Sequence, residues 1–495
     1  MGDRSDWDDT RADLAERQQA AREMGGPDRL AKQRRDGRLD ARARVHALLD
    51  EGTFREIGTL VGEVPSDAII TGTGLINGRP VMVGAEDFTV LAGSIGAGSN
   101  AKRYRIAELA LQERVPLIML LEGAGHRAGD HGVRSPTDLM MQAKCSGVVP
   151  VVTAIVGPSA GHGALIAPMS DFTLMSPQGA VFTAGPPVVK DSLGEEVTKE
   201  QLGGPSVALA SGLIHNLAES DHDVAAQIRT YLSFFPSSAW SYPVARPTND
   251  PTSRGTEAIL DIVPRNGRQG YDMCEVVTCV VDEGSWFEVQ PKFGRAIVCA
   301  LARIGGHPVA VIANQPMVLA GSVDADAADK AAHFIDVADA FHLPLVFLAD
   351  NPGMLPGSAS ERAGVLRSGA RMFAAQTRAR VPKVHLTLRK AYGFGSMVMS
   401  LPAFDGQTAT FGYPGATLGA MGASAFAESL GSDADESERL RRLETDASLR
   451  SAERFGFDEL IDPVDTRRHV AGALSLALNR RQMPATPRQM TAVMP

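Results

Sequence analysis

The chain has 495 residues, of which 44% are hydrophobic and 22% charged, and its formal net charge is −9. This composition is typical of a globular protein, and the length favours two or more domains because single cores stop growing at roughly 250–300 residues. The acidic balance gives no general attraction to nucleic acid or to an anionic membrane, so neither is expected as a partner. The four cysteines form no C-x-x-C pair, and we predict no metal in this chain.

Residues 1–50 are rich in Arg, Asp, Glu and Ala, with leucines at helical spacing. This pattern predicts a charged helical arm, which we expect to pack on a neighbouring molecule. The first residues are acidic where an export signal would be basic and then apolar, and the longest apolar runs are too short to span a bilayer. We therefore expect a cytoplasmic protein.

Beyond the arm, short runs of Val, Ile and Leu alternate with glycine-rich turns and alanine-rich stretches, which is the pattern of an α/β domain. Prolines and turn-forming residues gather in residues 240–255, which favours a linker there. We predict two domains, residues 1–245 and 250–495.

The two halves contain matching blocks in a constant register. Gly78-Arg79-Pro80-Val81 corresponds to Gly306-His307-Pro308-Val309, so that position 78 answers to position 306. The same offset relates Leu91-Ala92-Gly93-Ser94 to Leu319-Ala320-Gly321-Ser322. Farther along, the offset grows by four positions, and Gly161 corresponds to Gly393. A register held over separated blocks indicates duplication, and a period this long means two similar domains and not a solenoid.

Each half has a glycine-rich turn after an apolar run. The first turn is Gly157-Pro158-Ser159-Ala160-Gly161-His162-Gly163-Ala164, and the second is Arg389-Lys390-Ala391-Tyr392-Gly393-Phe394-Gly395-Ser396. A helix that begins in such a turn points its first, unpaired N–H groups at whatever lies there, so each turn is a candidate oxyanion site. The alternative is that the glycines only let a helix pack on a strand, which is less favoured because the turn occurs twice in register.

These turns lie in longer runs that resemble the carboxyltransferase (beta) subunits of biotin-dependent acyl-CoA carboxylases, of the propionyl-CoA and methylcrotonyl-CoA type. The resemblance extends over nearly the whole chain and is carried by several blocks: Leu39-Asp40-Ala41-Arg42-Ala43-Arg44, Asp87-Phe88-Thr89-Val90, Gly185-Pro186-Pro187-Val188-Val189-Lys190, Leu202-Gly203-Gly204, Ala313-Asn314-Gln315-Pro316 and Asp462-Pro463-Val464-Asp465-Thr466-Arg467-Arg468. It implies an α/β fold of two duplicated crotonase-like (ClpP/crotonase) β-β-α superhelix domains. It also implies a homohexamer whose sites lie between the N-domain of one subunit and the C-domain of another.

The resemblance implies the reaction as well. A carboxyl group would pass from carboxybiotin to the α-carbon of an acyl-CoA, such as acetyl- or propionyl-CoA, through an enolate stabilised by backbone amides. The amides of Gly161 and His162 would hold the thioester oxygen, and those of Phe394 and Gly395 the ureido oxygen. The sequence has no biotinyl-lysine segment and no ATP-grasp loop, so the biotin carboxylase and the biotin carboxyl carrier would be separate partners.

Other residues are expected to contact the substrates. By the resemblance, Gly125, Gly163 and Gly393 belong to the substrate-binding turns, and Met397 lies where relatives set acyl-chain preference. Lys102 and Arg103 follow a glycine-rich turn at a predicted helix start, where they could bind the coenzyme A phosphates. A solvated surface position is the alternative for this pair.

The chain departs from its relatives at both turns. They carry A-G-G-A where this chain has Ala160-Gly161-His162-Gly163, and Y-G-G-A where it has Tyr392-Gly393-Phe394-Gly395. If the changed positions require positive φ, Phe394 is more strained than His162. His126 lies in a loop one residue longer than the D-S-G-G-A-R of the relatives. It could form an acid–base pair with His162, or both histidines could be positional substitutions.

These departures leave two other functions open. One is a biotin-independent acyl-CoA decarboxylase or hydrolase on the same scaffold, in which His162 and Phe394 occupy the biotin side. The other is a non-catalytic subunit of a carboxylase complex.

Overall fold

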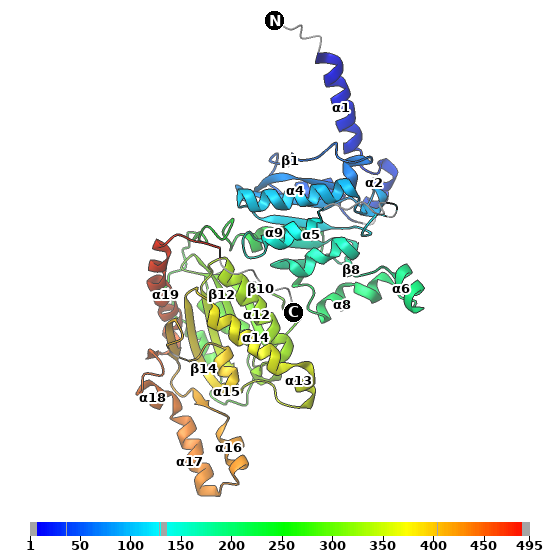
Figure 1. The fold of residues 1–495 in the computed structure, drawn as a ribbon. Coiled ribbons are helices and arrows are strands. Elements are labelled where there is room, and N and C mark those ends of the chain that lie inside the picture. Colours follow the sequence, from blue (N-terminus) through cyan, green and yellow to red (C-terminus); the bar gives the residue numbers. More distant parts are fainter. Residues whose placement is uncertain (1–6, 36, 128, 130–135, 403, 488–495) are drawn as a thin grey trace. The chain divides into compact units, whose positions relative to one another are not determined.

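The computed structural model describes residues 7–35, 37–127, 129, 136–402 and 404–487. The chain divides into two compact units, Met1–Ser233 (unit 1) and Phe234–Pro495 (unit 2) (Figure 1). Phe235 packs edge-on against Phe341, with ring centroids 5.7 Å apart, and the carbonyl of Ala239 accepts a hydrogen bond from His342. The segment that precedes the predicted linker therefore packs within unit 2.

Unit 1 begins with three helices, α1 (Asp8–Arg22), α2 (Pro27–Arg35) and α3 (Ala41–Leu48). Ala21 is the one buried residue of α1, whose first turn is acidic and whose last turn carries Arg22. That charge order suits the helix dipole. In α3 the buried residues are Ala41, Arg44, Val45 and Leu48, and Asp40 caps the helix by accepting from the Ala43 N–H at 2.9 Å.

The main sheet of unit 1 has seven strands in the order β1-β2-β3-β4-β5-β7-β9. Their bounds are β1 (Arg55–Glu56), β2 (Ile69–Ile76), β3 (Arg79–Glu86), β4 (Leu117–Leu121), β5 (Val151–Ile155), β7 (Phe172–Met175) and β9 (Asn216–Leu217). The pairs β1-β2 and β2-β3 are antiparallel, and the later pairs are parallel. Strands β4 and β5 are buried throughout and apolar except for Thr153, as parallel strands covered on both faces are.

A second, two-stranded sheet joins β6 (Pro158–Ala160) to β8 (Ala180–Phe182). The helices of unit 1 that follow the arm are α4 (Ala97–Glu113), α5 (Asp138–Cys145), α6 (Pro186–Leu193), α7 (Lys199–Gly203), α8 (Pro205–Ala210) and α9 (Asp221–Leu232). The 3₁₀ segments are η2 (Pro65–Ala68), η3 (Leu91–Gly93) and η4 (Gly161–Met169). The core lies between α4, α5 and the strands, and includes Ile106, Leu117, Met119 and Ile155.

Unit 2 has an eight-stranded sheet in the order β10-β11-β12-β13-β14-β15-β17, with β16 paired to β14. The strands are β10 (Phe287–Val289), β11 (Ile297–Ile304), β12 (His307–Asn314), β13 (Leu345–Asn351), β14 (Lys383–Tyr392), β15 (Gln407–Gly412), β16 (Thr417–Gly419) and β17 (Glu459–Leu460). As in unit 1, the pairs up to β11-β12 are antiparallel and the rest are parallel.

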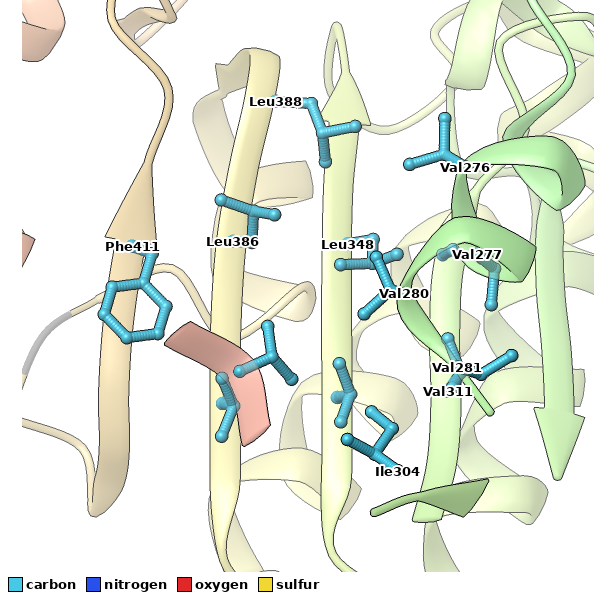
Figure 2. Close-up of a cluster of buried hydrophobic side chains, with 14 of the residues drawn as sticks. Val276, Val277, Val280, Val281, Ile304, Val311, Leu348, Leu386, Leu388 and Phe411 are labelled. Carbon is cyan, nitrogen blue, oxygen red and sulfur yellow. The ribbon is translucent and has the colours of Figure 1, made fainter. Parts of the chain in front are cut away.

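The helices of unit 2 lie around this sheet or extend beyond it (Figure 1). They are α10 (Ala258–Ile262), α11 (Met273–Val280), α12 (Ala325–Ala340), α13 (Ser358–Ala363), α14 (Val365–Arg378), α15 (Gly393–Val398), α16 (Ala423–Leu430), α17 (Ala434–Thr445), α18 (Ala447–Ala452) and α19 (Thr466–Ala477), with 3₁₀ segments η5 (Leu319–Gly321), η6 (Pro463–Asp465) and η7 (Leu478–Gln482). Figure 2 shows the valines of α11 beside Val311 and Leu348, while Leu386, Leu388 and Phe411 continue the same cluster across the sheet. No helix in the described ranges is long and apolar enough to cross a membrane.

The two units repeat one another in the predicted register. Strands β2 and β3 begin at Ile69 and Arg79, and α4 begins at Ala97; their counterparts β11, β12 and α12 begin at Ile297, His307 and Ala325, which is the offset of the matching sequence blocks. A Cβ on Gly93 would lie 2.2 Å from the carbonyl oxygen of Glu122, and one on Gly321 would lie 2.4 Å from that of Asp350. The close approach of a turn to a strand end is thus duplicated together with the elements.

Candidate active site

The first glycine-rich turn joins β6 to η4. Gly161 starts η4 with φ +58°, and an added Cβ there would find its nearest neighbour, the Thr183 oxygen, at 3.5 Å. As the first residues of the helical segment, Gly161 and His162 have N–H groups with no acceptor inside it. Over the described residues, no backbone hydrogen bond outside helices and strands uses the His162 N–H. The turn therefore remains a candidate oxyanion site.

Gly125 and Gly163 lie beside this turn. Gly125 has φ +86°, and a Cβ on it would come within 3.0 Å of the Ala160 oxygen. The loop that carries it is fixed from two sides, because the Ala160 N–H donates to Gly123 and the Ile95 N–H donates to Gly125. A Cβ on Gly163 would lie 3.2 Å from the Glu86 carboxylate. The structure thus brings together all four unit 1 turn residues predicted from the sequence.

Gly161 also borders an apolar cavity of about 420 Å³. Its walls come from η4, β8 and helices α6 to α8, and are formed mainly by Leu165, Val181, Phe182, Val189, Leu202, Val207 and Leu213. The cavity suits an apolar part of a ligand that reaches the first turn.

The second turn joins β14 to α15 in unit 2. Gly393 has φ +54°, and a Cβ there would lie 2.9 Å from the Ala420 oxygen. A Cβ on Gly395 would lie 2.5 Å from the Cα of Gly353, so the backbone of this turn is held against a neighbouring loop. Asn351 fixes that loop, because its side-chain oxygen accepts from the Gly353 N–H at 3.0 Å.

The changed residues occupy equivalent positions with different contacts. Neither His162 nor Phe394 has positive φ, so the backbone is not strained at either residue. The left-handed conformation is adopted by the preceding residues, Gly161 and Gly393, which are glycines in this chain as in the relatives. The ring of Phe394 packs toward α14, with its centroid 5.7 Å from that of Phe373. Met397 is exposed on α15, and its carbonyl accepts from Gln376.

His162 is held by a buried carboxylate. Its Nε2 lies 2.5 Å from Oδ1 of Asp138, which is fully buried at the start of α5. Arg103 bridges Asp138 to Glu86, with both contacts at 2.6 Å. Burial raises the pKa of Asp138, but Arg103 and His162 outweigh it and hold that pKa below its ordinary value. His126 is nearby, with ring centroids 6.5 Å apart.

Lys102 and Arg103 do not lie where the sequence suggested. Both are buried, and Lys102 Nζ donates to the carbonyls of Ser66 and Ile69. Burial lowers the pKa of Lys102 to about 8. The equivalent Lys330 is also buried and donates to Phe293 and to Ile297, the counterpart of Ile69. This duplicated contact joins a helix to the start of a strand. Lys102 and Arg103 are therefore neither phosphate ligands nor solvated surface residues.

Sequence reasoning missed a basic pocket of about 880 Å³ in unit 1. It is lined by four cations together with polar and apolar residues of the loop before η3: Arg29, Lys32, Arg38 and Arg127, with Gln33, Phe88, Thr89, Leu91, Ala92 and Ser94. Arg38 and Arg127 pair with the buried Glu122 and Asp67, whereas Arg29 and Lys32 have no carboxylate partner among the described residues. The run of basic residues in α2 was the feature of the sequence that could have indicated this pocket.

The basic pocket adjoins the first turn. The carbonyl of Ala92 in its wall accepts from the Ala124 N–H at 2.9 Å, and Ala124 directly precedes Gly125. One ligand could therefore place anionic groups in the basic pocket and reach the amides of the first turn.

The duplicated fold defines a class, the crotonase-like α/β proteins. A family model described as "Carboxyl transferase domain" matches residues 32–491. The chain belongs to the carboxyl transferase domain family.

Named relatives cover nearly the whole chain. The methylmalonyl-CoA carboxyltransferase 12S subunit of Propionibacterium freudenreichii subsp. shermanii is 37% identical over 95% of this chain and 94% of its own length. The propionyl-CoA carboxylase beta chain of Roseobacter denitrificans is 37% identical over 95% and 97%. The methylmalonyl-CoA decarboxylase subunit alpha of Veillonella parvula is 35% identical over 92% and 94%.

A solved structure matches at a TM-score of 0.90, with 35% sequence identity and 98% coverage of both chains. It is a transcarboxylase 12S hexamer with hydrolysed methylmalonyl-coenzyme A bound.

Proposed function

We propose that this chain is the carboxyltransferase subunit of a biotin-dependent acyl-CoA carboxylase, which transfers a carboxyl group to the α-carbon of an acyl-CoA. The observation that carries this proposal is the duplication of an amide-bearing turn, Gly161-His162 in unit 1 and Phe394-Gly395 in unit 2, within a chain of the carboxyl transferase family. Two oxygens gain negative charge in this reaction, and the chain provides one turn for each.

At the first turn, the amides of Gly161 and His162 would hold the thioester oxygen as it becomes an enolate oxygen. Preorganised N–H donors aimed at developing charge contribute about 3–4 kcal/mol each when tested by removal. Gly125 and Gly163 keep the surrounding backbone close because a side chain at either position would meet the Ala160 oxygen or Glu86.

At the second turn, the residues present fit a biotin ureido group. The Phe394 ring packs toward Phe373 on α14, and its backbone N–H remains outside the α15 hydrogen bonds. Carboxybiotin, when bound, supplies the carboxyl group and a basic ureido anion. The chain's own part is to orient the ureido oxygen with the amides of Phe394 and Gly395, while Gly393 and the exposed Met397 border the turn.

For the coenzyme A phosphates we assign the basic pocket in place of Lys102 and Arg103. Arg29 and Lys32 offer exposed cations in the pocket, and its wall connects through Ala124 to Gly125. Arginine and lysine are the usual phosphate ligands of proteins.

The partners and the assembly follow from the same proposal. The biotin carboxylase and biotin carboxyl carrier act as separate subunits, and the chain forms a homohexamer in which the residue 1–50 arm contributes contacts. Light scattering should give six copies, and a monomer would contradict this.

We also place the protein in the cytoplasm. All four cysteines, Cys145, Cys274, Cys279 and Cys299, are free thiols in the structure, as suits a reducing compartment. Cell fractionation tests this location.

The test of the proposed function is acyl-CoA-dependent fixation of labelled bicarbonate by the chain co-purified with its biotinylated partner, with avidin as the discriminating reagent. Avidin captures biotin and should abolish the fixation. Isolated chain that binds no acyl-CoA would support a non-catalytic subunit instead.

One observation favours a second candidate, a biotin-independent acyl-CoA decarboxylase. The His162–Asp138 pair places a side chain able to transfer protons at the first turn. In that case the chain alone should release CO2 from malonyl-CoA or methylmalonyl-CoA. No release without a biotin subunit eliminates the candidate.

A further inference from the structure

The imidazole of His162 links a buried carboxylate to an open part of unit 1. Its Nε2 lies 2.5 Å from Asp138 Oδ1 and 3.4 Å from Thr137 Oγ1. The Asp138 side chain has no exposed surface, whereas 26% of the His162 side chain is exposed. Nδ1 has no hydrogen bond to any residue that the structure describes and is not among its buried unpaired atoms.

Asp138 is fixed by groups other than His162. Its Oδ2 accepts from Arg103 Nε at 2.6 Å and from Gln142 Nε2 at 3.0 Å, and its backbone N–H donates to Asn100. Because Arg103 keeps this carboxylate ionised, it can only accept hydrogen bonds. His162 Nε2 must therefore carry the hydrogen, and Nδ1 of the neutral ring has a free electron pair.

Two buried carboxylates lie behind His162. Glu86 and Asp138 share the one guanidinium of Arg103, and burial raises the pKa of Glu86. Asp138 is the carboxylate that contacts the ring. His126, with its ring centroid 6.5 Å away, is the other titratable group facing the ring in the described part of unit 1.

We propose that His162 is a catalytic base for the acyl-CoA α-carbon, with Asp138 and Arg103 as positioning residues, so that the chain alone exchanges acyl-CoA α-protons with solvent. This inference rests on the proposed placement of the thioester oxygen at the Gly161 and His162 amides. The imidazole belongs to one of those two residues, and the Gly125–His126 loop borders both the turn and the ring.

The step is balanced within the site. The α-carbon–hydrogen bond breaks, the proton goes to Nδ1 of His162, and the electron pair forms the carbon–carbon double bond of the enolate. The charge moves to the thioester oxygen, which the amides hold. Reversal with a solvent deuteron returns a deuterated acyl-CoA, and neither CO2 nor biotin takes part.

The second half provides an internal comparison. Phe394 is the counterpart of His162 at the same position of its turn, and its ring packs near Phe373 and Gly369 of α14. That position in unit 2 therefore holds an apolar contact, while in unit 1 the equivalent side chain is held by a carboxylate. The acid–base pair is specific to the turn assigned to the thioester.

The test incubates the full-length chain, without any biotin subunit, with acetyl-, propionyl- and octanoyl-CoA in D2O, and follows α-deuteration by mass spectrometry. We expect exchange with at least one acyl-CoA. His162→Gln and His162→Gly should lower the rate by about 100-fold or more, the usual contribution of a general base.

The variants separate a catalytic from a structural role. His162→Gly restores the glycine of the relatives and keeps the backbone amide, so its loss of exchange would come from the missing imidazole. Asp138→Asn should change the pH profile of exchange, and His222→Gln, which removes an exposed imidazole elsewhere in unit 1, should change nothing. No exchange by the parent chain, or full exchange by His162→Gln, overturns the inference. Avidin-sensitive carboxylation in that case leaves the proposed function standing, whereas exchange without carboxylation overturns the proposed function.

Discussion

Gly161 has a left-handed backbone, and an added side chain there would have open space around it. A substitution at Gly161 therefore tests the role of the backbone amide without disturbing the packing. Gly161→Ala should cost about 1–2 kcal/mol of stability from the positive φ and lower carboxylation at least about tenfold, because the shifted amides lose alignment with the oxygen. Gly78→Ala is the control, since Gly78 has φ +75° in the β2–β3 hairpin and equally open space. Equal activity in the two variants would remove the oxyanion assignment.

Gly395 cannot serve the same purpose. A Cβ there would meet the Gly353 backbone at 2.5 Å, so a substitution displaces the loop as well as the amide. Loss of activity in a Gly395 variant therefore does not distinguish catalysis from packing.

Phe394→Gly tests whether the ring matters for the biotin side. Since the ring packs toward Phe373, its removal should cost about 1–3 kcal/mol, less than a fully buried phenylalanine. Carboxylation should stay within a few-fold of the parent because the donors are backbone amides. Thermal unfolding and the fixation assay measure the two effects. A large loss of turnover with little loss of stability would show that the ring acts in the reaction.

At the scale of elements, α2 should determine acyl-CoA affinity through the basic pocket. Lys32→Ala should weaken acyl-CoA binding by about tenfold, or 1.4 kcal/mol, with unchanged stability, because Lys32 is exposed and unpaired with any described carboxylate. Lys144→Ala removes an exposed lysine elsewhere in unit 1 and should have no effect. Calorimetric titration measures both, and unchanged affinity in Lys32→Ala would move the phosphates elsewhere.

Strand β14 carries a pH-dependent contribution to stability. His385 is buried, donates from Nδ1 to the Met399 carbonyl at the end of α15, and has its Nε2 2.8 Å from Thr387 Oγ1. Burial lowers the pKa of His385 to about 4, from an ordinary 6.5. Between these values the unfolded chain binds a proton that the folded chain does not, so stability falls as the pH drops from 6.5 to 4.

This loss should reach at most about 3.4 kcal/mol, at about 1.36 kcal/mol per pKa unit. Urea unfolding of unit 2 at several pH values should show it in the parent chain and show a shallower slope in His385→Gln. An identical slope in both proteins would rule out His385 as its source.

The sequence predicted the elements and their duplication well, because glycine turns and buried apolar runs are local signals. The starts of β2, β3 and α4 recur in β11, β12 and α12 at the predicted offset. Contacts between residues distant in the chain could not be predicted, because no local sequence pattern indicates them. The burial of Lys102 depends on the carbonyls of Ser66 and Ile69, and the Asp138 partner of His162 comes from a different helix. The basic pocket joins α2 to the loop that runs from Phe88 to Ser94, which is far along the chain.

For the whole molecule, the acidic net charge and the basic pocket are compatible because a coenzyme A binding site needs only local cations. Each unit provides one amide-bearing turn, and the proposed reaction needs both. The assembly is therefore expected to be part of the activity, and neither unit should transfer a carboxyl group by itself.

The most direct test of the central claim is the rate of labelled bicarbonate fixation into acyl-CoA by the complex of this chain with its biotinylated partner, measured with and without avidin. We predict fixation that requires both the chain and an acyl-CoA and that avidin abolishes. Fixation that persists at saturating avidin, or its absence with acetyl-, propionyl- and longer acyl-CoA substrates while the complex is intact, would contradict it.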